Sequence, residues 1–361
     1  MRSDSAAASF RTNRAGRTNR AGRFLLLPAF LVALLIDAGF TGNAAAQEAP
    51  RFQLPLQCVM GTDCWVLRYF DHDGGPGVRD HECGFLTGDD HRGIDMRVRD
   101  YVAMREGVLV LAAADGTVKA TRDGVEDVSV VDNTDSREEI SKYGLGNTVI
   151  VDHGNGWESA YGHMLKNSVL VREGDQVTAG QPIGMVGLSG LTTFPHVHFM
   201  VKHDNKNIDP FTGPGNDHAC GDTSGTLWTP EALAALEYRP SALLTAGFAD
   251  VLPNVKDAEE GRYPRDRLPR DGEVIAFWYH MFGIAEGDRE MVRLVGPGER
   301  VIAETERFAE RDRVLAFGFV GDKLNGRQLE PGVYRGEYRV IRSIDGTDRT
   351  LIDEIVEIAV D

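Results

Sequence analysis

The chain has 361 residues, of which 42% are hydrophobic and 26% charged, and its formal net charge is −16. The length indicates about two domains, and the composition argues against intrinsically disordered, collagen-like and multispan membrane proteins. The acidic charge argues against nucleic acid as a partner, because binding depends on Lys and Arg neutralising phosphates.

Residues 1–46 are predicted to be a secretory signal peptide. Arginines at positions 11–23 precede an apolar run at 24–36, and an Ala-x-Ala cleavage motif ends at Ala46. An uncleaved anchor is the alternative, but this run is shorter than the roughly 20 residues that span a bilayer. We expect export to the periplasm or the extracellular space, with no membrane span left after cleavage. Because residues 1–46 carry six Arg and two Asp, their removal changes the net charge from −16 to −20.

The four cysteines predict two disulfides, since an even number in an exported chain is typical of disulfide pairs. Three connectivities are possible. The spacing favours Cys58 with Cys64 as a short clip, and Cys83 with Cys220 across the middle of the chain. A Cys-rich zinc knuckle is the alternative, but the chain has no Cys-x-x-Cys pair.

Residues 47–80 are expected to form a mixed N-terminal segment, and residues 81–229 a mostly β, antiparallel domain. Short β-branched runs between turn signals predict its strands. These runs are Val108–Ala112, Gly116–Thr121, Asn147–Asp152 and His196–Val201. The polar residues 123–142 predict a surface excursion or a short helix.

Residues 230–271 are expected to form one Leu/Ala-rich helix, up to about residue 246, and then a polar linker. Residues 272–361 predict a second, smaller β-sandwich-like domain that is immunoglobulin-like in architecture only. Its predicted strands are Val274–His280, Met291–Val295, Val314–Val320, Gly332–Ile341 and Leu351–Val360.

Histidines and an aspartate recur at strand spacing in the first β domain. Residues two or four apart on a strand share a face, so His91 and Asp95 can point the same way, as can His196 and His198. The pair Tyr161 and His163 repeats the pattern. Three short strands are therefore expected to bring these side chains to one groove.

Catalytic zinc takes three nitrogen or oxygen ligands and leaves one position open for water. His91, Asp95 and His198 provide such a set without cysteine. Two further histidines, His163 and His196, are then free to move the proton of the attacking water or to stabilise the oxyanion. The sequence therefore favours a secreted zinc metallopeptidase.

Each motif also has a structural interpretation. His91 is alternatively a solvated loop residue, Asp95 a turn carboxylate, and His163 a core histidine. Of His196 and His198, one is alternatively a buried ring and the other its exposed neighbour. The occurrence of all five residues in order within one β domain favours the functional interpretation.

Three segments resemble the lysostaphin/LytM-type zinc metallopeptidases: HRGIDM at 91–96, GNTVIVDHGNGWESAYGHM at 146–164, and VREGDQVTAGQPIGMVGLSG followed by PHVHF at 171–199. The resemblance covers about 130 residues. It implies that His91, Asp95 and His198 bind Zn²⁺ and that His163 and His196 are catalytic. It also implies that Tyr161 lies at the active site and assists catalysis, and that Asn147 lies close to the groove and binds substrate.

The resemblance implies a zinc-dependent endopeptidase that hydrolyses peptide cross-links of peptidoglycan, with stem peptides as its partners. One alternative is a non-catalytic protein of the same fold that binds wall or activates another hydrolase. Another is a peptidase for a proteinaceous target. No oligomeric state is predicted.

The chain departs from many relatives at Met200, where they carry an acidic residue, and in its long 123–142 excursion; both bear on groove shape. Phe199 is predicted to lie in the core, while Trp157 and Phe194 are assigned to the groove or the core equally. The remaining histidines match no ligand position and are expected to be structural or surface residues: His72, His81, His153, His203, His218 and His280.

Overall fold

The computed structural model describes residues 48–215 and 219–361. Residues Gln47–Asp361 form one compact unit. The predicted signal peptide and His218 lie outside the described residues. In the described ranges, no helix is long and apolar enough to cross a membrane.

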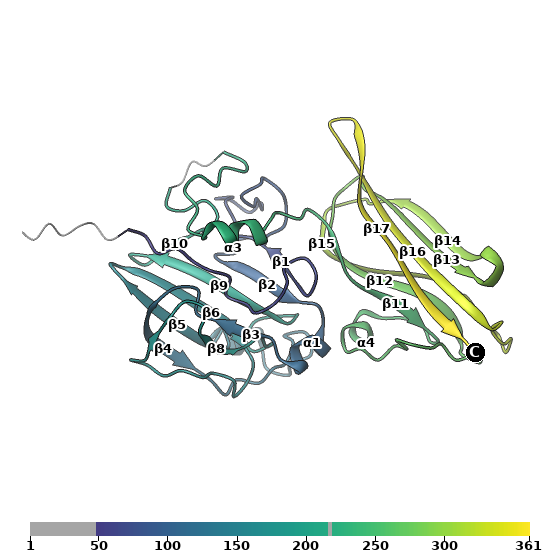
Figure 1. Ribbon diagram of the computed structural model, residues 1–361, viewed down its shortest axis with the longest axis horizontal. Coiled ribbons are helices and arrows are strands. Elements are labelled where there is room, and N and C mark those ends of the chain that lie inside the picture. The colour runs from purple at the N-terminus through teal and green to yellow at the C-terminus, as the bar shows by residue number, and fades with distance from the viewer. Residues whose placement is uncertain (1–47, 216–218) are drawn as a thin grey trace, which may run out of the picture. The chain divides into compact units, whose positions relative to one another are not determined.

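The peptidase-like part is built on an antiparallel sheet of eight strands (Figure 1). Seven follow the order β1-β2-β9-β6-β5-β4-β7, and β10 pairs with β9. The strands are β1 (Cys64–Arg68), β2 (Ile94–Val98), β4 (Gly116–Arg122), β5 (Asn147–Gly154), β6 (Trp157–Met164), β7 (Gln176–Val177), β9 (His196–His203) and β10 (Lys206–Ile208). The four strands predicted in this region are confirmed, with β3 (Leu109–Leu111) lying in a two-stranded sheet with β8 (Pro182–Met185).

Side chains alternate across the central strand β9, because successive residues of a strand point to opposite faces. Val197, Phe199 and Val201 are fully buried in the core. His196 and His198 therefore share the other face. The same sheet thus has one face that packs the core and one that carries the histidines.

The segment before residue 81 belongs to this sheet and its core. Phe52, Leu56 and Leu67 are buried in the main hydrophobic cluster, and β1 is hydrogen-bonded to β2. The strands of this sheet thus begin before residue 81, with β1. The division of the chain at residues 80, 229 and 271 stays a prediction.

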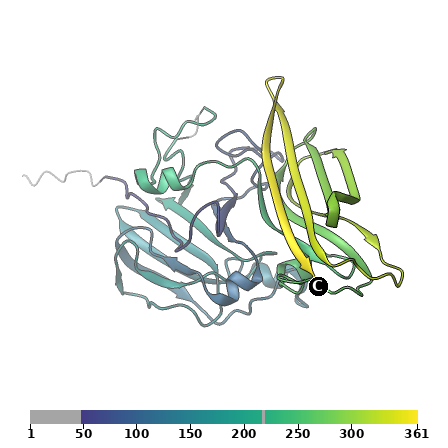
Figure 2. The same cartoon turned by 45° about the vertical axis from the view of Figure 1, so that its right-hand side comes forward.

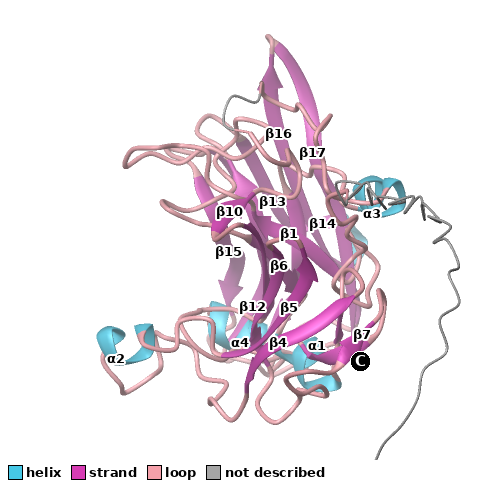
Figure 3. Ribbon diagram, turned by 90° about the vertical axis from the view of Figure 1, so that its left-hand side faces the viewer, coloured by secondary structure: helices cyan, strands magenta, loops and turns pink. Residues whose placement is uncertain are grey.

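Short helices lie between the strands (Figure 3). Helix α1 (Tyr101–Glu106) begins at Asp100, whose carboxylate accepts from the Ala103 N–H. Helix α2 (Arg137–Ser141) has a capping box of Ser136 and Glu139, so the 123–142 excursion contains the short helix that was predicted.

The C-terminal part consists of two antiparallel sheets, one of three strands (β11-β12-β15) and one of four (β14-β13-β16-β17). Their strands are β11 (Ala242–Ala249), β12 (Val274–Ile284), β13 (Arg289–Gly296), β14 (Arg300–Phe308), β15 (Arg313–Lys323), β16 (Gly332–Ile344) and β17 (Thr347–Val360). A 3-10 turn, η1 (Pro297–Glu299), precedes β14. The long β16–β17 hairpin is the yellow pair of strands in Figure 2. One hydrophobic cluster takes residues from both sheets, as in a sandwich.

The predicted helix from 230 to about 246 is wrong beyond its first turns. Helix α3 ends at Ala235 (Pro230–Ala235), and residues 242–249 form β11, which pairs with β12. Pro240 interrupts the helical pattern, and pairing with β12 decides the conformation of the residues that follow. Strand β14 was missed because its side chains are almost all exposed and show no apolar alternation.

The predicted linker contains helix α4 (Val255–Glu259), which contacts the first sheet. The Glu259 carboxylate lies 2.8 Å from Nη2 of the fully buried Arg97 on β2. His280 of β12 lies 2.9 Å from the same carboxylate. Three buried ionisable groups thus join α4 and β12 to the eight-stranded sheet.

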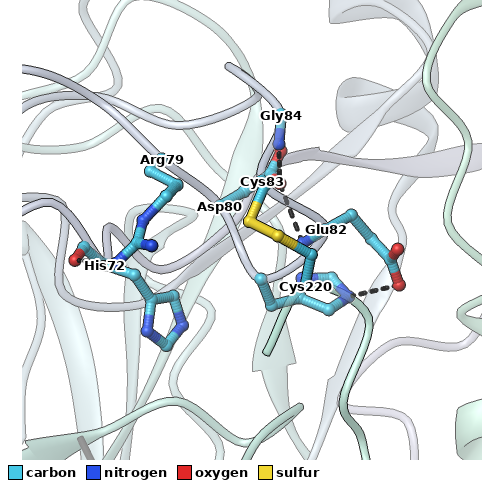
Figure 4. Close-up of a disulfide and its surroundings, with 8 residues drawn as sticks. His72, Arg79, Asp80, Glu82, Cys83, Gly84 and Cys220 are labelled. Atoms are coloured by element: carbon cyan, nitrogen blue, oxygen red, sulfur yellow. Dashed lines mark hydrogen bonds and ion pairs between the residues drawn. A yellow bond between two sulfur atoms is a disulfide. The ribbon is translucent and has the colours of Figure 1, made fainter. Parts of the chain in front are cut away.

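Both predicted disulfides are confirmed: Cys58 with Cys64, and Cys83 with Cys220. Figure 4 shows the second, which ties the turn around Asp80 and Gly84 to a segment 137 residues away in the sequence. Asp80 Oδ1 accepts from the Gly84 N–H at 2.7 Å within that turn. The first disulfide closes the loop that leads into the edge strand β1.

Candidate metal centre

Three side chains with metal-binding atoms meet at the centre of the histidine face. Asp95 on β2 is the direct cross-strand partner of His198 on β9, and His91 lies in the loop before β2. Asp95 Oδ1 is 3.0 Å from His91 Nε2 and 2.8 Å from His198 Nδ1. One ligand atom from each residue lies within 4.8 Å of the others. The structure therefore brings the three predicted metal ligands together.

This donor set fits zinc. Bonds of about 2.0–2.1 Å to a tetrahedral zinc place neighbouring ligand atoms roughly 3.3 Å apart, close to the spacings around Asp95 Oδ1. Two imidazoles and one carboxylate also leave a fourth position free for water or substrate. The residues present thus fit a catalytic rather than a closed structural zinc site.

His91 is oriented by the main chain. Its Nδ1 lies 2.7 Å from the carbonyl oxygen of Tyr69, the residue that follows β1. A carbonyl only accepts, so Nδ1 carries the proton and Nε2 is left as the metal-binding atom. The edge strand β1 therefore takes part in building the centre.

Gly93 allows the HRGID loop to approach β9. A β-carbon at residue 93 would lie 2.5 Å from His198 Nε2 and 2.8 Å from the Phe199 carbonyl oxygen. Any side chain larger than hydrogen would displace the imidazole or the strand. The motif has glycine at this position because the loop passes so close to His198 and Phe199 that no side chain fits.

His163 and His196 lie beside the three ligands. Their ring centroids are 4.7 Å apart, and His163 is 6.0 Å from the ring of His198. His196 Nδ1 lies 2.9 Å from the Phe194 carbonyl oxygen, and His163 Nδ1 lies 2.7 Å from that of Ser189. Both rings therefore carry the proton on Nδ1. His196 Nε2 lies 3.3 Å from Asp95 Oδ1 and so faces the ligand cluster.

A β-bulge turns His163 toward the site. Residues 147 and 149 of β5 face residues 164 and 161 of β6, so one residue of β5 lies opposite both Gly162 and His163. His163 has a φ of 58°, and its N–H donates to the Leu145 carbonyl. Bulges of this kind redirect a side chain, often next to an active site.

The prediction that Tyr161 lies at the active site is wrong. Tyr161 is fully buried in the core, pairs with Phe199 across the strands and accepts from the Ala113 N–H at 2.7 Å. The spacing argument failed because the bulge reverses the faces of residues 161 and 163. Burial also raises the pKa of Tyr161 to about 12, so its phenol stays protonated.

Asn147 has a structural role instead of the predicted contact with substrate. Its side chain is fully buried and donates to the carbonyls of Val125 and Met164, and its oxygen accepts from the Val125 N–H. Its own N–H donates to Ser189 Oγ. Because Ser189 holds His163, Asn147 supports the site from behind.

The 123–142 excursion also supports the site, which its polarity did not reveal. The carboxylate of Asp127 accepts from the N–H groups of Lys166 and Leu188. Leu188 directly precedes Ser189, so Asp127 fixes the loop that orients His163. Burial raises the pKa of Asp127.

The ionisation of the cluster follows from its burial and its close charges. Burial raises the pKa of Asp95, but His91 and His196 outweigh this and bring it well below its usual value. Burial lowers the pKa of His91, but Asp95 outweighs it and raises the value, against the charge of Arg68. Burial lowers the pKa of His198 and, together with the neighbouring imidazoles, brings that of His163 well below its usual value.

The described histidines outside the cluster have structural partners, as predicted. His72 lies 2.7 Å from Asp209, His153 contacts the Asp115 carbonyl, and His280 pairs with Glu259. His81 stacks on Phe211, and His203 stacks on Trp157.

The three aromatic residues divide between core and site. Phe199 is fully buried in the core, as predicted, and Trp157 is also buried there. Phe194 packs against His196 with ring centroids 4.5 Å apart. Of the two residues left open by the sequence, Phe194 is therefore the one that contacts a site histidine.

Comparison with known proteins places the site within a family match. The family model described as Peptidase family M23 matches residues 89–210. No curated protein matches the chain. The matched residues include all five members of the cluster, namely His91, Asp95, His163, His196 and His198.

Several solved structures are similar to part of the chain. The catalytic domain of the prophage-encoded M23 protein EnpA from Enterococcus faecalis has 26% identity and a TM-score of 0.30, over 46% of this chain and 98% of that chain. For lysostaphin from Staphylococcus simulans the values are 24% and 0.26, over 40% and 85%. For a zinc containing peptidase from Vibrio cholerae they are 23% and 0.26, over 39% of each. The family match confirms the resemblance predicted from the motifs: residues 89–210 match the model of Peptidase family M23.

Proposed function

We propose that this protein is a zinc-dependent endopeptidase that hydrolyses peptide cross-links of peptidoglycan. The observation that carries the proposal is the cluster itself: three converging ligand atoms of His91, Asp95 and His198, with the imidazoles of His163 and His196 beside them. A binding protein has no need for two further oriented imidazoles at a metal site.

Zinc would be held by His91 Nε2, Asp95 and His198 Nδ1, and it would supply a bound water of pKa about 7 and polarisation of the peptide carbonyl. Asp95 Oδ1 lies 3.0 Å from His91 Nε2 and 2.8 Å from His198 Nδ1, so the three ligand atoms are already gathered where the ion would bind. The carbonyl of Tyr69 holds His91 in the tautomer that a metal requires.

His163 and His196 carry out the proton transfers. Each has Nδ1 bound to a main-chain carbonyl, so only Nε2 exchanges a proton with substrate or water. One Nε2 accepts the proton of the attacking water, and one donates to the leaving amine or stabilises the oxyanion. Burial of both rings excludes competing water from this step.

The substrate and the compartment follow from the M23 match and the cysteines. The resemblance to lysostaphin/LytM-type enzymes implies peptide bridges of the wall. Two disulfides suit an oxidising compartment, consistent with export to the periplasm or the extracellular space.

The test is incubation of the purified, zinc-loaded protein with cross-linked sacculi, with and without a chelator. We expect release of peptide fragments that stops on chelation and returns with zinc. His163→Ala and His196→Ala should keep about one zinc per chain and lose at least roughly 100-fold in rate, within the range of general acid–base effects. His203→Gln, on the same strand as His196, is the matched control and should keep its activity.

The outcomes separate the alternatives. Zinc below about half an equivalent per chain, with no release from several wall types, would favour the non-catalytic wall-binding role. Zinc at one equivalent with cleavage of Gly-rich proteins but not of sacculi would favour a proteinaceous target.

A further inference from the structure

Arg68, at the end of β1, lies on the same face of the sheet as the metal ligands. It is the cross-strand partner of Asp95, after a bulge between Val66 and Arg68. Directly opposed residues of antiparallel strands project to the same side. The guanidinium of Arg68 therefore belongs to the histidine face, although Arg68 lies outside the family-matched range of 89–210.

Phe194 links this guanidinium to the site. The Arg68 Cζ lies 5.7 Å from the centroid of the Phe194 ring, and that ring packs against His196. Arg97 lies over the same ring at 5.3 Å. Two guanidinium groups thus contact one aromatic ring beside the predicted proton-transfer residue.

The two arginines differ in their partners. Arg97 is bound by the Glu259 carboxylate and by the carbonyls of Val98 and Arg99. Among the described residues, Arg68 has no carboxylate within 4 Å. A buried nitrogen of each guanidinium, Nε of Arg68 and Nη1 of Arg97, has no hydrogen-bond partner, so the carboxylate is what distinguishes the two. Arg68 is only partly exposed. A half-buried guanidinium without an anion is costly, and a ligand carboxylate would pair with its accessible Nη atoms through charged hydrogen bonds.

We propose that Arg68 binds a free carboxylate of the peptide substrate next to the scissile bond and so selects acidic cross-links. This inference rests on the proposed function. A cross-link made through a diamino acid carries such a carboxylate beside the amide that is cleaved. In a chain with a net charge of −16, an acidic substrate needs a local cation at the site.

The test uses two cross-linked stem-peptide dimers that differ only in the carboxylate next to the scissile bond, which is free in one and amidated in the other. Wild-type enzyme should show a kcat/KM roughly 10- to 100-fold higher for the free acid, as expected for a charged hydrogen-bonded pair. Arg68→Met keeps the packing on Phe194 and should remove this preference, so that its kcat/KM is the same for the two dimers. Arg68→Lys should keep part of the preference.

Arg172→Met, at an exposed arginine of the same domain, is the control for loss of a positive charge and should keep the preference. Equal rates of wild type on the two dimers would overturn the proposal. It would also be overturned if Arg68→Met and Arg68→Lys, both folded, lowered the rates on both dimers equally.

A binding measurement separates this proposal from the proposed function. The zinc-loaded His163→Ala protein is titrated calorimetrically with each dimer, with and without Arg68→Met. Tighter binding of the free acid by about tenfold, lost with Arg68→Met, supports the carboxylate site even if no dimer is hydrolysed by wild type. Equal binding of both dimers, or binding of neither, overturns it.

Discussion

Gly93 lies against the imidazole of His198, so closely that a β-carbon would be 2.5 Å from Nε2. The contact joins the loop that carries His91 to the strand that carries His198. Gly93 has no side chain, and this absence allows the predicted ligands His91 and His198 to lie close together.

Gly93→Ala is expected to abolish zinc binding, because the added methyl group displaces His198 from Asp95. Zinc per chain after dialysis, measured by atomic emission, should fall from about one to near zero. Gly88→Ala is the control, since a β-carbon there meets nothing within 4 Å and residue 88 has no positive φ. Normal zinc content in Gly93→Ala would contradict the geometry.

Asn147→Ala is expected to destabilise the protein by about 2–4 kcal/mol, because it removes three hydrogen bonds between a buried side chain and the main chain of Val125 and Met164. The free energy of unfolding in urea checks this, with the exposed Asn207→Ala as control. A raised KM at unchanged stability would instead support the contact with substrate predicted from the sequence.

Tyr161→Phe is expected to leave kcat within about twofold of wild type, because the hydroxyl is in the core and far from proton transfer. Stability should fall by about 1–3 kcal/mol, since the buried Ala113 N–H loses its acceptor. Steady-state kinetics and urea unfolding measure the two effects. A 100-fold loss of kcat with full stability would restore Tyr161 to the active site.

Stability should fall in acid through the Arg97–Glu259–His280 group. Arg97 and His280 bring the pKa of Glu259 down to about 2 against the raising effect of burial, from an ordinary value of 4.5. Because its pKa is lower in the folded state, Glu259 stabilises the fold above about pH 4.5. This stabilisation is lost as the pH falls toward 2. Burial lowers the pKa of His280, so this residue also destabilises the fold as the pH falls below about 6.5.

Urea unfolding of wild type and Glu259→Gln measures this dependence. At pH 6 the variant should be less stable by about 3–5 kcal/mol, because Arg97 loses its buried partner. The difference should shrink at pH 3. The exposed Glu310→Gln is the control, and an equal difference at both pH values would contradict the assignment.

Much of the fold and the site is readable from local pattern. Short β-branched runs between turn signals predicted β3, β4, β5 and β9, and the motif spacing identified His91, Asp95 and His198 as a set. The cysteine spacing favoured the pairing that the structure contains. These features depend on residues close together in the chain or on a well-marked motif.

Other features could not be predicted from the sequence, because they depend on contacts between residues that are far apart in the chain. The bulge that separates Tyr161 from His163 arises from pairing between β5 and β6. The strand after Pro240 exists because β12 accepts it as a partner. Arg68 carries no motif, and only the register of β1 against β2 reveals its position.

The sequence by itself therefore determined the fold class of the protein, mostly β, and the set of candidate metal ligands, His91, Asp95 and His198. Only the tertiary structure decided which of the candidate side chains face the site. The physical reason is that side chains alternate along a strand. One extra residue in a bulge therefore moves a side chain from the core face of the sheet to the groove face, and pairing with the neighbouring strand determines where the bulge lies.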